Sequence, residues 1–499
     1  MKKIFIYTTM VLAIALSSCK KDMIDVKPTD KINAGDVFSS EEGLDVFRTG
    51  MYANIANGDG TLYSTQLPIQ GGILGDDMVY GNAWYKMFSS EYSFKQAPTN
   101  AGNKLLWTKL YYFTEICNTL VSADIKNVDP DKVKQFKAEA RALRAMAYVD
   151  VARFFGKAYH LDGGASKALP YVDYVDYEAK PSRNTMKEIY EKAINDLTIA
   201  LPDLAKLKGS ELYMNQTAVK AVLARIYMDM AGPAFGSDAN LVKARSYAKD
   251  AYDDITLIGT TELVNGLSNI NSETILAIGQ MLPDLEKWRD FHSFHDDLDG
   301  MGEDFLVNKT IFNSFASTDI RKAFFIREPH YYKYYNQGVY SVDKLASSAF
   351  LNRKGYTLYG KFPRLDVQVP GVRGSLGLGH YNYIRGTEMA LIVAECDARI
   401  GDNNAEAQTL LLEIQKRADA TAVVSVNTGA NLVDEIVMEA RKELLGEGHD
   451  RRNIQRLGVT LTRTGTHWAL KGINIPAGDA RWQYLVPEKE MTSNPNLAD

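Results

Sequence analysis

Residues 133–155 read VKQFKAEARALRAMAYVDVARFF. Apolar side chains recur in this stretch every three or four positions, which is the spacing of one face of an α-helix. Asp129 and Pro130 come just before it and supply an N-cap and a first-turn proline. The stretch therefore predicts a long amphipathic helix. Its apolar face consists of Val133, Phe136, Ala140, Leu143, Ala147, Val151 and either Phe154 or Phe155.

Further helical patterns lie on both sides of this stretch. An aromatic-rich pattern precedes it across a short turn that contains Asp and Pro, so the two predict a helical hairpin. A second pair follows, and then a third helix that begins after the breaker Ala231-Gly232-Pro233. The C-terminal part repeats the pattern. The predicted helices are 105–125, 133–155, 185–204, 216–230, 240–254, 387–400, 405–418 and 432–445.

Small residues in two of these helices indicate how the helices pack. They recur every three positions in one helix and every four in another, and small side chains let helix backbones approach closely. This resembles tetratricopeptide-like packing, although no strict 34-residue repeat is present. We therefore predict a mainly α fold built as a tetratricopeptide-like scaffold of helical hairpins. The residues are Ala218, Ala221 and Ala224, and Ala390, Ala394 and Ala398.

The stretch 259–383 differs from the rest because it is rich in Gly, Pro, Asn and Tyr and has only short apolar runs. We expect irregular structure there, with a few short helices and strands wrapped on the helical scaffold. Loops held by a rigid scaffold are where binding residues tend to lie. The predicted organisation is an N-terminal helical region at 41–258 and a C-terminal region at 259–499, irregular to 383 and helical from 384, together forming one compact unit.

The pattern at the N-terminus predicts a targeting signal. Lys2 and Lys3 precede an uncharged run at 4–16, which is shorter than a membrane-spanning helix. The run ends in Leu16-Ser17-Ser18-Cys19, which resembles a bacterial lipobox. The resemblance implies a signal peptide at 1–18, cleavage before Cys19, acylation of Cys19 and a lipidated tether at 19–40. The alternative is an ordinary secretory signal with an incidental cysteine.

Composition excludes several classes of function. The chain has 499 residues and a formal charge of −5, so it lacks the basic excess that drives nucleic-acid binding. Its three cysteines cannot form a disulfide scaffold or a four-cysteine zinc site. No P-loop and no His-Glu-x-x-His motif is present. We therefore expect no cofactor and no catalytic metal, and we expect Cys117 and Cys396 to be buried thiols.

Two polar segments carry candidate ligand-binding residues. Asp76 and Asp77 precede Trp84 and Tyr85, and Trp288 precedes His292 and Asp296. Carboxylates and imidazoles hydrogen-bond sugar hydroxyls, and aromatic rings stack on sugar faces, so these seven residues form the predicted ligand site. It requires the fold to bring the two segments to one face.

The alternatives for these residues are structural. Asp76 and Asp77 suit a turn or a cap, the histidine segment suits a solvated loop, and Trp84 and Trp288 suit a core or an interface. Trp107 suits the core, and Trp468 and Trp482 suit packing. The tyrosine-rich run 331–335 could be a ligand surface, a contact with a β-barrel or a sheet edge.

The chain resembles the SusD/RagB family of Bacteroidetes outer-membrane lipoproteins. The resemblance rests on the lipobox together with several short stretches in the order typical of the family. Each stretch is weak alone, and together they span almost the whole mature chain. They are FKAEARALRAMAY at 136–148, FFG at 154–156, LP at 169–170, the pattern at 189–202, AVLARIYM at 221–228, IRGTE at 384–388 with AE at 394–395, ELLGEGHD at 443–450, PEKE at 487–490 and NPNL at 494–497.

The resemblance implies a protein that is lipid-anchored at the outer membrane and faces outward. It implies work beside a SusC-like TonB-dependent β-barrel transporter, to which the protein delivers captured oligosaccharide without catalysing a reaction. The alternatives are a binder of peptides rather than glycans, a secreted glycoside hydrolase on a helical scaffold, and a surface adhesion protein.

Overall fold

The computed structural model describes residues 37–56, 60–81, 87–279, 291–295, 305–325, 332–336, 339–343, 358, 360–363 and 379–498. Cys19, Trp84, Tyr85, Trp288 and Asp296 lie outside these ranges, as do the signal peptide and most of the tether. Within the described ranges, no helix is both long enough and apolar enough to cross a bilayer.

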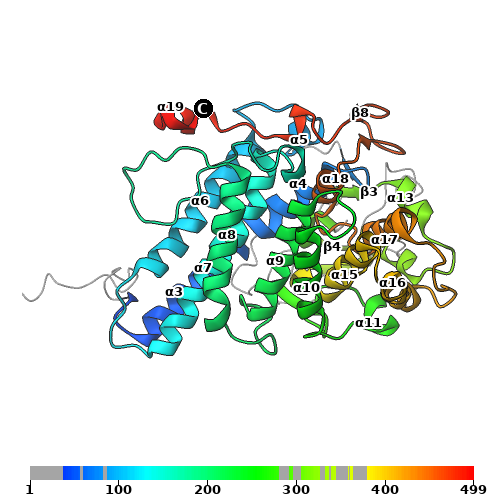
Figure 1. Cartoon of the computed structure of the whole chain (residues 1–499), viewed down its shortest axis with the longest axis horizontal. Coiled ribbons are helices and arrows are strands. Elements are labelled where there is room, and N and C mark those ends of the chain that lie inside the picture. Colours follow the sequence, from blue (N-terminus) through cyan, green and yellow to red (C-terminus); the bar gives the residue numbers. More distant parts are fainter. Residues whose placement is uncertain are drawn as a thin grey trace, which may run out of the picture.

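Helical hairpins stack side by side to form most of the molecule (Figure 1). Along the chain, α6 packs on α7 and α7 on α8, then α9 on α10, α10 on α15, and α15 on both α16 and α17. The prediction of a mainly α, tetratricopeptide-like scaffold is confirmed. The bounds are α6 Ala101–Ser122, α7 Pro130–Phe155, α8 Met186–Ala200, α9 Gln216–Ala231, α10 Ala239–Tyr252, α15 Gly386–Ile400, α16 Asn404–Ala418 and α17 Gly429–Glu443.

Local sequence signals explain where these helices begin. The Asp129 carboxylate accepts a hydrogen bond from the Asp131 amide at 2.9 Å, and Pro130 occupies the first turn of α7. Thr185 and Glu188 form a reciprocal capping box at the start of α8. The alanines that recur in α9 and α15 are at most 1% exposed, so they lie where neighbouring helices meet. Cys117 and Cys396 are fully buried, as expected.

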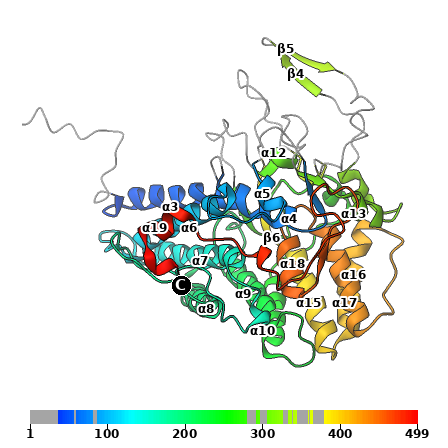
Figure 2. The same cartoon turned by 90° about the horizontal axis from the view of Figure 1, so that it is seen from above.

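One further long helix, α3, and several shorter elements fill the ends and one side of the scaffold. Figure 2 shows α12 and the β4–β5 hairpin on one side, with α8, α10 and α15 on the other. The tyrosine-rich run forms part of β4, so its backbone belongs to a hairpin. These elements are α3 Glu41–Ala56, η2 Leu62–Gln66, α4 Leu67–Ile73, α5 Ser89–Tyr92, η3 Tyr159–Leu161, η4 Leu201–Asp203, α11 Thr260–Val264, α12 Phe291–His295, α13 Lys309–Ser314, η6 Ile320–Phe324, α18 Asp450–Leu457, η7 Ala480–Trp482, α19 Glu488–Ser493 and η8 Pro495–Leu497.

The described ranges contain four two-stranded antiparallel sheets, and two of them join distant parts of the sequence. In the first, Met78 pairs with Val307 and Tyr80 with Phe305. This pairing ties the end of α4 to the irregular stretch. The pairs are β1 Met78–Tyr80 with β3 Phe305–Val307, β2 Thr274–Ile278 with β6 Tyr381–Arg385, β4 Tyr332–Asn336 with β5 Val339–Asp343, and β7 Leu461–Thr462 with β8 Asn474–Ile475.

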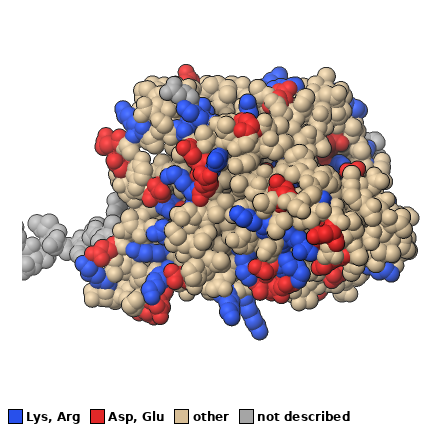
Figure 3. Space-filling view, in the orientation of Figure 1, with Lys and Arg blue, Asp and Glu red and all other residues tan. Residues whose placement is uncertain are grey.

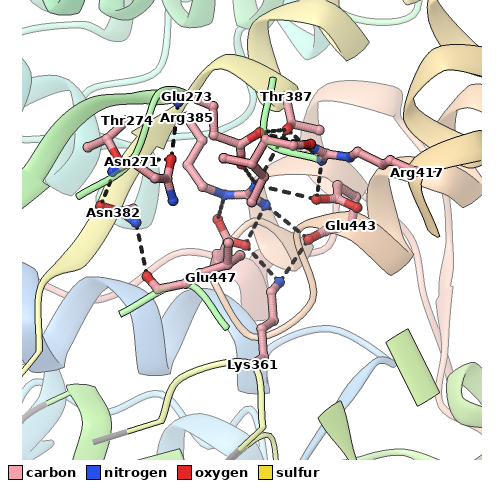
Figure 4. A network of polar contacts seen from close by, with 12 residues as sticks. Asn271, Glu273, Thr274, Lys361, Asn382, Arg385, Thr387, Arg417, Glu443 and Glu447 are labelled. Carbon is pink, nitrogen blue, oxygen red and sulfur yellow. Dashed lines mark hydrogen bonds and ion pairs between the residues drawn. The ribbon is translucent and has the colours of Figure 1, made fainter. Parts of the chain in front are cut away.

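A buried network of charged side chains joins β6 to the end of α17 (Figure 4). Arg385 donates to Glu273 at 2.6 Å, to Glu447 at 2.8 Å and to Glu443 at 3.3 Å. Lys361 Nζ lies 2.7 Å from Glu447, and Arg417 donates to Glu443 at 2.7 Å. Paired charges of this kind can remain ionised in the interior. Several of these residues lie in the stretches 384–388 and 443–450, so the structure gives those family-like stretches a physical role.

Burial and the paired cations act in opposite directions on these carboxylates. Burial alone would raise the pKa of Glu443, but the charges of Arg417, Arg385 and Arg321 hold that pKa at about 2. Glu443 is therefore ionised at neutral pH. The network holds the turn after α17 against β6.

The division of the chain at residue 258 stays a prediction.

Candidate ligand-binding site

Asp76 and Asp77 lie between α4 and β1, and both have partners from the C-terminal part of the chain. Arg441 of α17 donates from Nε to Asp77 at 2.9 Å and from Nη2 at 2.5 Å. Asp77 is 3% exposed, so this two-point ion pair is largely shielded from water. A ligand that used the Asp77 carboxylate would have to displace Arg441.

Asp76 is held by a loop near the C-terminus. The Thr464 amide donates to its carboxylate at 2.7 Å, the Thr464 hydroxyl donates at 2.9 Å, and Asn308 Nδ2 donates at 3.3 Å. His467 lies 3.3 Å from the same carboxylate. Asp76 therefore joins the start of β1 to the loop that follows β7. The ligand-binding roles of Asp76 and Asp77 stay predictions.

The described residues that flank the two predicted segments lie close together. The segment that contains Asp76 and Asp77 continues into β1, which pairs with β3, and α12 contacts both β3 and α4. The Phe88 and Phe294 rings lie 6.1 Å apart between centroids. Phe88 closely follows Trp84 and Tyr85 in sequence, and Phe294 lies between Trp288 and Asp296. The described flanks of both segments are thus neighbours.

His292 and His295 are fully buried within this region. Phe291, beside them, stacks on Tyr381 with 3.9 Å between ring centroids. Burial, followed by the neighbouring His292 and Lys361, lowers the pKa of His295 well below its usual range, so its imidazole is neutral. In the described part of the chain no cluster of His, Cys, Asp and Glu could hold a metal ion. A ligand would reach His292 only after the packing around α12 opened.

Trp468 is a candidate binding residue that the sequence reasoning treated as packing. The residue is 38% exposed, and its Nε1 donates to the Tyr80 carbonyl of β1 at 2.6 Å. It also packs on Tyr92, with 5.1 Å between centroids. The surrounding sequence, TGTHWALKG at 464–472, is polar and contains glycine. That signal selected Trp84 and Trp288 and could equally have selected Trp468.

The other described tryptophans belong to the core. Trp107 is 3% exposed and Trp482 is 2% exposed, as expected for packing residues. Trp468 is therefore the most exposed tryptophan within the described ranges. Its indole nitrogen is already bonded, so a ring face is what it can offer to a ligand.

Arg463 fixes the backbone beneath Trp468. Its guanidinium donates to the Ile73 carbonyl at 2.7 Å and to the Tyr92 carbonyl at 2.5 Å, and it lies 4.1 Å from the centre of the Tyr92 ring. Burial lowers the pKa of Arg463 to about 10, so it remains charged at neutral pH. Arg463 thereby locks the ends of α4 and α5 to the loop that carries Trp468.

Asp450, the first residue of α18, packs closely against Gly75, next to Asp76. An added Cβ at Gly75 would lie 2.5 Å from the Asp450 Cβ, so only glycine allows this approach. Burial raises the pKa of Asp450 well above its usual range, and the nearby charge of Asp77 raises it further. A neutral Asp450 can lie beside the Asp77–Arg441 pair without adding a second buried anion.

The arrangement suits binding of a polar, uncharged ligand. It combines a partly exposed tryptophan with a backbone that Arg463 holds in place. The two adjacent carboxylates that could have suggested hydrolysis are both engaged by protein donors. A glycosidase needs one carboxylic acid and one carboxylate facing the bond to be cleaved.

Two family models match the chain, in order and in separate halves. Residues 22–228 match a model described as starch-binding associating with outer membrane, and residues 290–496 match the model of the SusD family. A curated relative, SusD-like protein P2 of Formosa agariphila, is 23% identical over 527 aligned positions, which cover 98% of this chain and 97% of the relative.

Solved structures show the same fold. A SusD superfamily protein of Bacteroides thetaiotaomicron is 24% identical and superposes with a TM-score of 0.78, covering 91% of this chain and 98% of that one. A protein from Bacteroides vulgatus described as a putative sugar binding protein is 22% identical, with a TM-score of 0.75 and coverage of 92% and 98%. The tetratricopeptide-like scaffold is thus shared along almost the whole chain.

Proposed function

Because the chain belongs to the SusD family, we propose that it is a cell-surface lipoprotein that captures oligosaccharide and delivers it to a SusC-like TonB-dependent transporter, without catalysing a reaction. The description of the first matching model and that of the Bacteroides vulgatus neighbour support a carbohydrate ligand.

The observation that supports the proposal is that the described flanks of the two predicted segments are neighbours and that Trp468 bonds to one of them. β1 pairs with β3, Phe88 packs near Phe294, and Trp468 bonds to the Tyr80 carbonyl of β1. Neutral sugars offer no charge, so their affinity comes from stacking and directional hydrogen bonds. We propose that Trp84, Tyr85 and Trp288 join Trp468 as stacking surfaces at this place, with Asp76, Asp77, His292 and Asp296 as its polar surroundings.

The screen that tests this function uses the mature chain on a glycan array, with a peptide library as the matched control. We expect binding to a class of glycans, no comparable binding to peptides, and no released product when the bound glycan is incubated with the protein. Selective peptide binding would favour the peptide-binding alternative. Cleavage of the glycan by the purified chain, but not by its Asp76→Asn and Asp77→Asn variants, would favour the hydrolase.

The proposed anchor is the acylated Cys19, followed by a tether to residue 40. Two or more acyl chains on one cysteine hold a protein on a membrane, whereas a single chain binds weakly. Cys19→Ala should therefore move the protein from the membrane fraction to the soluble fraction. Retention of the variant on membranes without detergent would place the anchor elsewhere.

The proposed partner is a SusC-like barrel in the outer membrane. Affinity purification of the chain from membranes in mild detergent should recover a large β-barrel protein in a defined ratio. Recovery of the lipoprotein alone, under conditions that keep other outer-membrane complexes intact, would contradict the delivery step. It would leave the glycan-binding step standing.

A further inference from the structure

A second hollow lies away from the site around Asp76 and Asp77 and shares no residue with it. It has a volume of about 340 Å³, which is within the range of ligand pockets. Its floor is α6, one wall is the loop at 170–181, and the other wall consists of α19 and η8 at the C-terminus. In the space-filling view it opens at the upper left, below α19 (Figure 3). We call it the α6 groove.

Hydrogen bonds fix both walls of the α6 groove. Asn118 on α6 donates from Nδ2 to the carbonyls of Val172 and Tyr174, each at 3.1 Å. The Tyr111 hydroxyl donates to the Pro170 carbonyl at 2.8 Å. The wall at 170–181 is therefore tied to the floor before any ligand arrives.

The C-terminal wall is tied to the same loop. Asn494 Nδ2 donates to the Pro181 carbonyl at 2.9 Å, and Asn496 Nδ2 donates to the Lys180 carbonyl at 2.7 Å. Because both walls are already ordered, binding would require little loss of conformational entropy. The α6 groove is thus a formed feature of the folded chain.

Aromatic rings line the α6 groove at different depths. Tyr177 is 78% exposed and Tyr174 is 44% exposed, whereas Tyr111 is half-buried and Trp107 lies in the floor. Exposed tyrosines on an ordered loop offer ring faces to a ligand at little entropic cost. The Tyr177 hydroxyl lies within hydrogen-bonding reach of Glu115 on α6, so this exposed tyrosine lies beside the floor.

The charged lining of the α6 groove is strongly asymmetric. Four of its side chains are carboxylates and one is an ammonium: Glu115, Asp176, Glu178 and Glu490, and Lys180. Within the described part of the chain, neither Glu178 nor Glu490 forms an ion pair. The lining therefore carries an excess of negative charge, which attracts cations and disfavours anionic ligands.

We infer that the α6 groove is a second ligand site, and that it binds an oligosaccharide with free primary ammonium groups. Tyrosine faces can stack on the C–H faces of a sugar ring and can also attract an ammonium group by cation–π interaction. The carboxylates of the rim supply charge-assisted hydrogen bonds to the same ammonium. The choice of a sugar ring as the carrier of the ammonium rests on the proposed function.

Isothermal titration calorimetry of the mature chain tests the assignment with three probes of matched length. These are a β1,4-linked glucosamine trisaccharide, its fully N-acetylated counterpart and trilysine. We expect the glucosamine trisaccharide to bind at least tenfold more tightly than the N-acetylated one at low salt, and to lose most of that advantage at 0.5 M salt. Equal binding of the two sugars, or no binding of either, overturns the assignment of an ammonium ligand. If trilysine binds as tightly as the glucosamine trisaccharide, the inference that a sugar ring carries the ammonium groups is overturned.

Variants assign the binding to the α6 groove. Glu178→Gln and Tyr177→Ala should each weaken the glucosamine trisaccharide at least fivefold. The matched controls are Glu191→Gln, an exposed carboxylate on α8, and Tyr112→Ala, an exposed tyrosine on α6 outside the lining, and both should bind like the parent. Indistinguishable effects of variants and controls would overturn the site, provided that thermal unfolding shows all four to be folded.

The experiments distinguish a wrong assignment of the α6 groove from a wrong proposed function. Glycans found on the array should keep their affinity in Glu178→Gln and Tyr177→Ala, because the site beside Trp468 shares no residue with the α6 groove. Array binding without glucosamine binding would refute only the second site. Glucosamine binding that also disappears in Trp468→Ala would place that ligand in the first site and overturn the inference.

Discussion

Arg441 and Asp77 are 364 residues apart in sequence and form a two-point ion pair, with donor–acceptor distances of 2.9 and 2.5 Å. The pair joins α17 to the start of β1. Asp77 is shielded, whereas the Arg441 side chain is 31% exposed. The segment that carries the candidate site in the first half of the chain is therefore positioned by a helix of the second half.

Arg441→Ala should destabilise the folded chain, because it leaves the Asp77 carboxylate buried without its cation. Breaking a buried pair typically costs ~3–5 kcal/mol, and the partial exposure of Arg441 places the expected loss near the lower end of that range. Chemical denaturation of the mature chain measures it. Arg481→Ala is the control, because its pair with Asp479 is more exposed and should contribute about 0–1 kcal/mol. Equal losses in the two variants would contradict a special role for the pair.

The network around Arg385 should be more sensitive still. Arg385 is 1% exposed and contacts Glu273, Glu443 and Glu447 (Figure 4). Arg385→Ala leaves several buried carboxylates without their shared cation, so we expect a loss of at least ~3–5 kcal/mol and poor recovery of folded protein. Lys249→Ala on α10, where the pair with Asp253 is exposed, is the matched control and should behave like the parent. Normal stability of Arg385→Ala would show that the carboxylates find other partners.

The free energy of unfolding should decrease in two separate steps as the pH is lowered. Burial lowers the pKa of His449 from 6.5 to about 4, so its imidazole is neutral in the folded chain. Because the pKa of His449 is lower in the folded chain, the stability that the neutral imidazole contributes is complete above pH 6.5 and is lost as the pH falls toward 4. This loss in the free energy of unfolding is ~3 kcal/mol at most. Cationic partners hold the pKa of three buried carboxylates at about 2, against the effect of burial; these are Glu388, Glu395 and Glu443. The stability that they contribute is therefore complete above pH 4.5 and is lost as the pH falls to 2.

His449→Gln separates the two steps. The variant should lose part of the pH dependence between 6.5 and 4, because His295, whose pKa burial also lowers, keeps its own share, and it should keep the whole step below pH 4.5. Denaturant unfolding of the parent and the variant at half-unit pH intervals measures both steps. His160→Gln is the control, because His160 is only partly buried and should leave the upper step in place. An upper step of unchanged size in His449→Gln would assign the whole step to other groups, His295 first.

Local signals predicted much of the scaffold. The 3.6-residue periodicity located α7, and Asp129, Pro130 and Thr185 predicted helix starts because capping depends on neighbouring residues alone. The alanines that recur in α9 and α15 indicated close helix packing, because their spacing can also be read from residues close together in the sequence. The fold class follows from these signals, since each helix buries its apolar stripe on the next.

The candidate site was less predictable, because its contacts are non-local. Nothing near Asp77 in the sequence indicates Arg441, and nothing near Asp76 indicates Thr464. The strands β1 and β3 have three residues each, which is too few for a periodic pattern. Trp468 lay in a polar segment that could have been selected, but its bond to the Tyr80 carbonyl required the fold.

The central claim is that aromatic side chains from these converging segments bind a glycan. The measurement that tests it most directly is the affinity of the array-selected glycan for Trp84→Ala, Trp288→Ala and Trp468→Ala, measured by titration calorimetry beside their melting temperatures. Phe235→Ala, an exposed aromatic residue outside the site, is the control. Truncating a stacking aromatic at a hot spot costs ~2 kcal/mol or more, so we predict at least tenfold weaker binding for Trp84→Ala and Trp288→Ala with melting temperatures nearly unchanged, and the same loss for Trp468→Ala. Lower melting temperatures with unaltered affinity would contradict the claim, show that these tryptophans are packing residues, and move the search to the tyrosine-rich run at 331–335.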